Sequence, residues 1–182
     1  MENAMQIQWF LFGLICAIFY GYVGLDFDSD PESCIATAEY DKRVVLQGSA
    51  EDWENSNVDM SIYIDVASRY DHVFDAAFFM SFLLVVTGLL HMIFRTRHIR
   101  LPLRVIAALA QWALFISVIA GLFVRISHAG RVCSGDYLAE GESTEGYMMT
   151  QGSMLAFLGY LWLTLMSVGL CVALGAVFLM TS

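Results

Sequence analysis

Four long apolar stretches constrain this chain more than any other feature of its sequence. An α-helix needs about 20 mostly apolar residues to cross the hydrocarbon core of a bilayer. Stretches that meet this requirement lie at about residues 7–25, 73–94, 103–124 and 152–180. Only residues 95–102 link the second and third, so these two must form an antiparallel pair. The sequence therefore predicts an all-α membrane protein, with a four-transmembrane-helix bundle as the single domain over residues 1–182.

The first apolar stretch could instead be a cleaved signal peptide. A signal peptide has a positively charged flank before its apolar region and small residues at its cleavage site. The flank in this chain contains Glu2 and no Lys or Arg, and no clear run of small residues follows Tyr22. We therefore expect the first stretch to be retained as a membrane span.

Arginines gather in the link between the second and third spans, where Arg95, Arg97 and Arg100 occur without any carboxylate. Carboxylates outnumber basic residues in the first outer loop, residues 26–72, and in the second, residues 125–151. Lys and Arg are retained on the cytoplasmic side of a membrane. We therefore expect both termini to be cytoplasmic, in the plasma membrane or another membrane of the secretory pathway. The alternative is the mitochondrial inner membrane, with the arginine link in the matrix.

The first outer loop is longer than a simple connection requires. Residues 43–46 and 60–66 have strand-like composition, and they flank a polar stretch of turn residues at 48–57. This pattern is typical of two short strands joined by a turn. We expect a small extracellular domain that contains a short β-hairpin or sheet and covers one end of the bundle.

Each outer loop contains one cysteine, Cys34 in the first loop and Cys133 in the second. Cys16 and Cys171 lie inside spans and cannot reach them. In an oxidising compartment the simplest arrangement is a disulfide bond between the two loops. Two free thiols, or a bond to a partner chain, are the alternatives.

Small residues recur at every fourth position in the spans. Helices in lipid pack through such residues because they let two backbones approach closely. The predicted packing faces are Gly13, Ala17 and Gly21 in the first span, Ala113, Ser117 and Gly121 in the third, and Ser167, Cys171 and Gly175 in the fourth. We expect a tight bundle whose remaining faces meet the lipid bilayer, other membrane protein subunits or copies of itself.

Two groups of charged residues are candidates for a site. Asp75 and Arg125 should lie at a similar outer depth on adjacent helices, so we expect an ion pair between them. Asp26, Asp28 and Asp30 resemble the start of a calcium-binding EF-hand loop. The rest of that motif is missing, and the mismatch favours an acidic, solvated rim over a calcium site.

Histidines and polar span residues support two further alternatives. His72 and His128 fall near the outer ends of the second and third spans, and His91 and His98 near the inner ends. Such pairs suit haem ligands in an electron-transfer subunit, but they are interfacial, which disfavours haem. A pore-forming or transport subunit would need polar faces around an axis. The candidates for such faces are Thr87, Gln111, Ser117 and Thr164.

Other classes of function find no support in the residues. The net charge of −9 makes nucleic acid a poor partner. The sequence has no nucleophile–base set, no glycine-rich phosphate loop and no cysteine cluster with metal-binding spacing. We therefore expect no enzyme, no metal and no cofactor.

The order of the parts resembles tetraspan membrane proteins of the claudin, PMP22 and MARVEL families: a short inner terminus, a longer first outer loop, a short basic turn and a shorter second outer loop. The resemblance covers the whole chain in topology but not in motif. Claudins carry a Gly-Leu-Trp followed by two cysteines, whereas here Trp53 follows the single Cys34. The resemblance implies a membrane-organising, adhesive or channel-accessory role, and no functional residue is transferred by it.

The leading hypothesis is therefore a non-enzymatic integral membrane protein that acts by lateral assembly. It would serve as a structural or accessory subunit of a membrane complex, or as a membrane-organising tetraspan protein.

Overall fold

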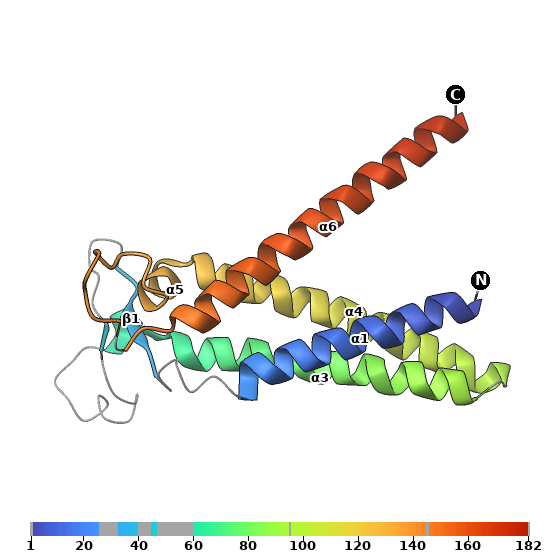
Figure 1. Cartoon of the computed structure of the whole chain (residues 1–182), viewed down its shortest axis with the longest axis horizontal. Coiled ribbons are helices and arrows are strands. Elements are labelled where there is room, and N and C mark those ends of the chain that lie inside the picture. Colours follow the sequence, from blue (N-terminus) through green and yellow to red (C-terminus); the bar gives the residue numbers. More distant parts are fainter. Residues whose placement is uncertain are drawn as a thin grey trace.

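The computed structural model describes residues 2–25, 33–39, 45–46, 60–94, 96–144 and 146–181. The long helices in these residues are α1 (Glu2–Leu25), α3 (Val66–Ile93), α4 (Arg97–Ile126) and α6 (Met149–Thr181). At one end lie the strands β1 (Ile35–Thr37), β2 (Val45–Leu46) and β3 (Tyr63–Asp65), the 3-10 helix η1 (Met60–Ile62) and the short helix α5 (His128–Cys133) (Figure 1). We call these short elements, with the turn that follows α5, the cap. The fold is therefore mostly helical, with a small sheet at one end.

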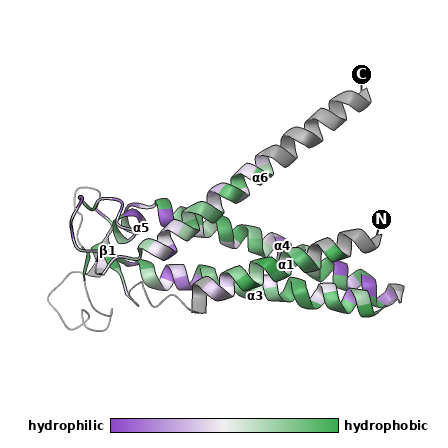
Figure 2. Ribbon diagram, in the orientation of Figure 1, coloured by the Kyte–Doolittle hydropathy of each residue, from purple (hydrophilic) through white to green (hydrophobic). Residues whose placement is uncertain are grey.

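Two stretches in the described part of the chain, Val66–Ile93 and His98–Ile126, are long and apolar enough to cross a membrane. A shorter apolar helix covers Phe10–Tyr22. Figure 2 shows hydrophobic residues along the middle of the helices, with hydrophilic ones near the cap and near the turn between α3 and α4. By length and composition, α3 and α4 thus have the properties of membrane spans.

The helices extend beyond the apolar segments that predict them. α3 begins at Val66, several residues before the predicted span, because Asp65 caps it: the carboxylate accepts a hydrogen bond from the Ser68 backbone N–H at 3.0 Å. α4 begins at Arg97, and the Arg100 Nε closes the turn before it by donating to the Phe94 carbonyl at 3.0 Å. Hydropathy locates the apolar part of each helix, whereas capping residues decide where the helix begins.

α3 is the central helix, with α1 and α4 packed against it (Figure 1). Its buried residues recur every three or four positions, which places them on one side of the helix. They include Tyr70, Phe74, Ala77, Leu84 and His91. α4 presents a row of mostly small or aliphatic buried residues, namely Ala107, Ala110, Leu114 and Val118.

The predicted small-residue faces agree with the structure best in α1. A Cβ at Gly13 would lie 2.8 Å from the Leu84 Cβ and 3.1 Å from the Val85 backbone nitrogen, so this glycine lets α1 touch the backbone of α3. Gly21 also faces α3, where a Cβ would lie 3.0 Å from the Phe78 ring. Ala17, between them, is half-buried.

The predicted face of α4 needs a correction. Gly121 is buried, and a Cβ there would lie 2.8 Å from Val73 of α3 and 2.9 Å from Leu155 of α6. Ala113 and Ser117 are only half-buried, because a strict four-residue repeat drifts by about 40° per step around an α-helix. The buried row of α4 instead combines steps of three and four residues, which keeps it on one side.

α6 packs on α4 near the cap and then diverges from the other helices (Figure 1). A Cβ at Gly159 would lie 2.8 Å from the Leu122 Cβ, so the two helices are in close contact there. One turn further, the Trp162 ring packs edge-on against Phe12 of α1 and Phe115 of α4, with centroids 5.6 and 6.1 Å apart. These contacts hold the cap-side half of α6.

Beyond Trp162, the described side chains of α6 do not pack against the rest of the described chain. Every side chain from Leu163 to Ser167 is exposed. The side chains of Cys171 and Gly175 lie outside the described residues. The expectation of one tight bundle of all four long helices is therefore not met at Ser167.

Of the two predicted alternatives, a hairpin or a small sheet, the structure has the sheet, with three antiparallel strands in the order β2-β1-β3. Ala36 of the central strand β1 pairs with Val45 on one side and with Ile64 on the other. The two predicted segments do form strands, but they do not pair with each other. β1 escaped prediction because three residues are too few to show an alternating pattern.

Candidate functional site

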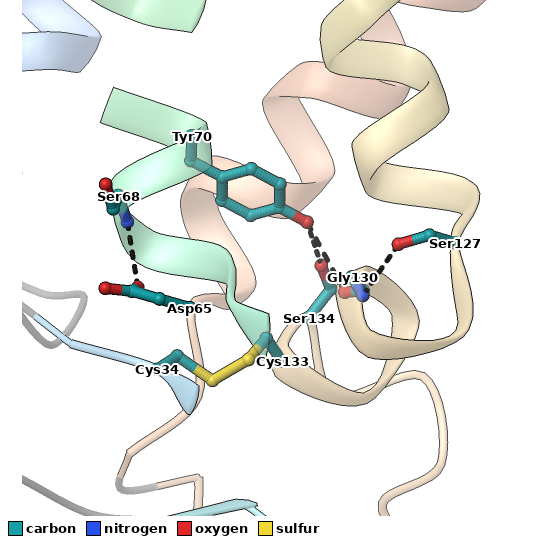
Figure 3. The surroundings of a disulfide bond; sticks show 8 residues. All are labelled: Cys34, Asp65, Ser68, Tyr70, Ser127, Gly130, Cys133 and Ser134. Carbon is teal, nitrogen blue, oxygen red and sulfur yellow. Dashed lines mark hydrogen bonds between the residues drawn. A yellow bond between two sulfur atoms is a disulfide. The ribbon is translucent and has the colours of Figure 1, made fainter. Parts of the chain in front are cut away.

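The cap is tied together by a disulfide bond between Cys34, just before β1, and Cys133, the last residue of α5 (Figure 3). Both side chains are fully buried. This is the pairing that the distribution of one cysteine per outer loop predicts. Its sequence separation of 99 residues corresponds to a stabilisation of about 4–5 kcal/mol in the chain-entropy account of disulfides.

Tyr70 of α3 connects the helical bundle to this bond. Its side chain is fully buried, and its hydroxyl lies 3.1 Å from the Ser134 Oγ and donates to the Gly130 carbonyl at 3.4 Å (Figure 3). The Ser127 Oγ caps α5 by accepting from the Gly130 N–H at 3.2 Å. These contacts fix α5 against the first turns of α3.

Backbone hydrogen bonds complete the cap. The Val66 N–H donates to the Cys34 carbonyl at 2.9 Å, and the Met148 N–H donates to the Cys133 carbonyl at 2.7 Å. Each partner of the disulfide is therefore bonded to the residue that begins, or immediately precedes, a long helix. The cap sets where both α3 and α6 start.

The predicted ion pair between Asp75 and Arg125 is wrong. Arg125 instead forms a bidentate ion pair with Asp136, in which its Nη1 and Nη2 donate at 2.9 and 2.6 Å. Its Nε donates to the Gly152 carbonyl at 2.9 Å. Asp75 is exposed, because it lies on the side of α3 opposite the buried row that contains Phe74 and Ala77. Similar predicted depth on adjacent helices therefore did not imply facing side chains.

Asp136 is shared between two arginines. The Arg131 Nε donates to it at 3.3 Å, in addition to the pair with Arg125. Partial burial by itself would raise the pKa of the Asp136 carboxyl, but the hydrogen bonds and positive charges of the two arginines outweigh burial and lower it. The guanidinium of Arg131 also lies 4.9 Å from the centre of the Tyr137 ring.

Pockets lie at the cap end of the described residues. One, of about 460 Å³, is lined by Val132, Tyr137, Leu138, Glu142, Ser143 and Tyr147. The other, of about 380 Å³, lies between α4, α5 and α6 and is lined by Arg125, Ile126, Arg131, Asp136, Ala156 and Tyr160. The second pocket contains both arginines of the shared pair, so it is the more strongly charged of the two.

The histidines do not form the pairs that a haem would need. His91 is buried in α3, whereas His98 is exposed at the start of α4. His128 is buried in the cap beside Tyr137, with ring centroids 5.7 Å apart, whereas His72 is exposed. At each end of the bundle, one histidine is therefore buried and the other is exposed.

The hydroxyl groups considered for a pore bond to their own helices. The Thr87 Oγ1 donates to the Leu83 carbonyl at 2.8 Å, and Ser117 and Thr164 likewise donate to the carbonyls four residues earlier, at 3.0 and 2.8 Å. Gln111 is half-buried in α4. These hydrogen bonds use the hydroxyl donors of Thr87, Ser117 and Thr164 within their own helices.

Calcium candidates cannot be placed. Asp26, Asp28 and Asp30 lie outside the described residues. Among the residues that are described, no group of three or more His, Cys, Asp or Glu side chains is arranged to hold a metal ion.

Comparison with known protein families, curated proteins and solved structures finds no match to this chain. The site is therefore defined by its own geometry. Sequence reasoning missed Asp136 and Tyr70 in particular. The signal for Asp136 was its place between Arg131 and the second half of an acidic loop, whereas Tyr70 resembles any aromatic residue of a helix.

Proposed function

We propose that this chain is a non-enzymatic integral membrane protein that crosses the bilayer four times and acts by lateral assembly with copies of itself or with other membrane subunits. In this proposal α1, α3, α4 and α6 are the four spans. The cap lies outside the cytoplasm, and the turn between α3 and α4 and both termini lie inside.

Two independent properties support this orientation. Arginines at and after the α3–α4 turn favour the cytoplasmic side. The Cys34–Cys133 disulfide at the opposite end forms in an oxidising compartment, which fits the lumenal or extracellular side. The arginines at one end and the disulfide at the other therefore support the same orientation.

The observation that carries the assembly proposal is the exposure of α6 beyond Trp162. Large apolar side chains there, including Leu163, Leu165 and Met166, are 42–57% exposed, and they point in all directions around the helix. A helix that leaves its own bundle in this way offers its surface to lipid and to another helix. Ser167, at which the predicted small-residue face begins, lies on this surface.

Accessibility of single introduced cysteines tests the topology. Thr96→Cys places a thiol in the α3–α4 turn, and Thr144→Cys places one in the cap; both positions are exposed. A membrane-impermeant maleimide should label Thr144→Cys in intact cells and Thr96→Cys only after permeabilisation. Labelling of Thr96→Cys in intact cells, or a protein that stays dissolved without detergent, would contradict the topology.

The mass of the purified protein in mild detergent tests assembly. We expect the wild-type particle to exceed one chain, and Ser167→Leu to reduce its mass because the added bulk blocks close helix approach. Ala120→Leu is the matched control, since it adds similar bulk at an exposed position of α4. A single-chain mass for the wild type, or equal effects of the two variants, would argue against assembly through α6.

A further inference from the structure

The pocket between α4, α5 and α6 has the charge of an anion site. Arg125 and Arg131 contribute two positive charges and Asp136 one negative charge, which leaves the lining net positive. The side chain of Arg131 is 47% exposed. Its Nε alone bonds Asp136, and neither terminal nitrogen makes a hydrogen bond to the part of the chain that the structure describes. Arg131 can therefore donate two further hydrogen bonds.

One face of α6 makes room for a ligand beside these arginines. The Gly152 carbonyl accepts from Arg125, Ala156 lies one turn further along, and Tyr160 one turn beyond that. Ala156, which has a small side chain, lines the pocket between Gly152 and Tyr160. Tyr160 is 59% exposed, and its hydroxyl is available as a second donor at the far end of the pocket.

Large apolar side chains lie next to the lining residues along α4 and α6. Ile126 forms part of the wall, and Phe123 and Phe157, on the same two helices, are 66% and 59% exposed. A small water-soluble anion would leave these side chains uncovered. A molecule with a phosphate head and hydrocarbon chains would satisfy both the arginines and the aromatic surface.

We propose that this pocket binds the phosphate group of a glycerophospholipid from the leaflet on the cap side. Arg131 and the Tyr160 hydroxyl donate hydrogen bonds to the phosphate oxygens, and Arg125 adds positive charge while it stays paired with Asp136. The acyl chains lie along Phe123 and Phe157. This inference rests on the proposed membrane crossing, because it needs the outer ends of α4 and α6 at headgroup depth.

Native mass spectrometry of the full-length, delipidated protein in detergent tests the site, with phosphatidylglycerol as the probe. Wild-type protein should retain one phosphatidylglycerol more tightly than a diacylglycerol with the same acyl chains. Arg131→Gln should weaken retention about tenfold, the effect of losing one charge-assisted hydrogen bond. Arg69→Gln, at an exposed arginine near the same end of α3, should leave retention unchanged.

A second variant tests lipid retention without disturbing the fold. Tyr160→Phe removes one exposed hydroxyl and should weaken retention several-fold while leaving the monodispersity of the particle unchanged. Equal retention by wild type, Arg131→Gln and Tyr160→Phe would overturn the proposal. Protection against thermal unfolding by inorganic phosphate as strong as that by phosphatidylglycerol would also overturn it, because the site would then recognise a free anion.

Failure of this inference is distinguishable from failure of the proposed function. A protein that requires detergent, and whose Thr96→Cys variant is labelled only after permeabilisation, but which retains lipid indiscriminately, would refute the lipid site alone. A protein that is soluble without detergent would refute the membrane proposal itself.

Discussion

The Tyr70 hydroxyl lies 3.1 Å from the Ser134 Oγ, across a sequence separation of 64 residues. Tyr70 belongs to a helix with the properties of a membrane span, and Ser134 directly follows the cysteine that closes the disulfide. This buried polar contact therefore joins the bundle to the cap. It is one of few specific contacts in a core made mostly of apolar side chains.

Tyr70→Phe should destabilise the protein by about 1 kcal/mol, because the Ser134 hydroxyl and the Gly130 carbonyl lose a buried partner. The measurement is the midpoint of thermal unfolding in detergent. Tyr63→Phe is the control, since the Tyr63 ring is half-buried in β3 and its hydroxyl has no hydrogen bond among the described residues. Equal midpoints for Tyr70→Phe and wild type would show that the contact contributes nothing.

Cys34→Ser and Cys133→Ser should each abolish the compact, fast-migrating form on non-reducing gels. Each should lower stability by up to about 4–5 kcal/mol, the chain-entropy value for so long a loop. The double variant should be no less stable than either single one, because both remove the same bond. Cys16→Ser should migrate as wild type, since Cys16 is a free cysteine in α1. Additive losses in the double variant would be incompatible with the pairing.

Gly13→Ala should destabilise the contact between α1 and α3, whereas Gly21→Ala should be neutral or stabilising. The added methyl group at Gly13 would meet the Leu84 Cβ and the α3 backbone, which cannot give way cheaply, while at Gly21 it would meet only the Phe78 ring. Overpacking costs about 1–3 kcal/mol, and replacing glycine by alanine in a helix gains up to about 1 kcal/mol. Thermal unfolding of the two variants should therefore shift in different directions or by clearly different amounts. The reverse order would contradict the close approach at Gly13.

Stability should depend on pH through Asp136. Its pKa is lower in the folded protein than in the unfolded chain, so its contribution is complete above about pH 4, the ordinary value for aspartate, and is lost as the pH falls below it. Asp136→Asn should therefore be less stable than wild type at pH 7, and the difference should shrink at pH 3.

Asp75→Asn serves as the matched control for Asp136→Asn at pH 7. Asp75 has no ion pair with Arg125, so this variant should unfold at the wild-type temperature. A loss of stability in Asp75→Asn equal to that in Asp136→Asn would instead favour the ion pair that the sequence predicts.

The sequence predicted the structure best where a single physical requirement decides it. Burial in hydrocarbon demands a long apolar run, and the runs that contain Phe74 and Leu114 do lie in long helices. The cysteine pair followed from there being one cysteine in each outer loop. In both cases the pattern leaves few alternatives.

Prediction failed where the direction of a side chain decides the outcome. Asp75 and Asp136 are equally plausible partners for Arg125 by charge, but only the path of the turn after α5 brings Asp136 within 2.6 Å. Likewise, the four-residue spacing in α6 implied a packing face at Ser167, although no helix in the described part of the chain covers it. Hydropathy predicts where a residue lies along the helix axis. The direction in which its side chain points around that axis is set by contacts with other elements.

In the described part of the chain, α6 is held only near the cap, so a tilt of its attached end moves its far end. α6 is held at the Gly152 carbonyl, at Gly159 and at Trp162, and its remaining turns extend away from the bundle. A helix of its 33 residues is about 50 Å long. The roughly 19 residues beyond Trp162 span about 28 Å, so a tilt of about 5° at Trp162 would displace the far end of the helix by about 2.5 Å. Small rearrangements around the disulfide would thus become larger displacements at the far end of α6.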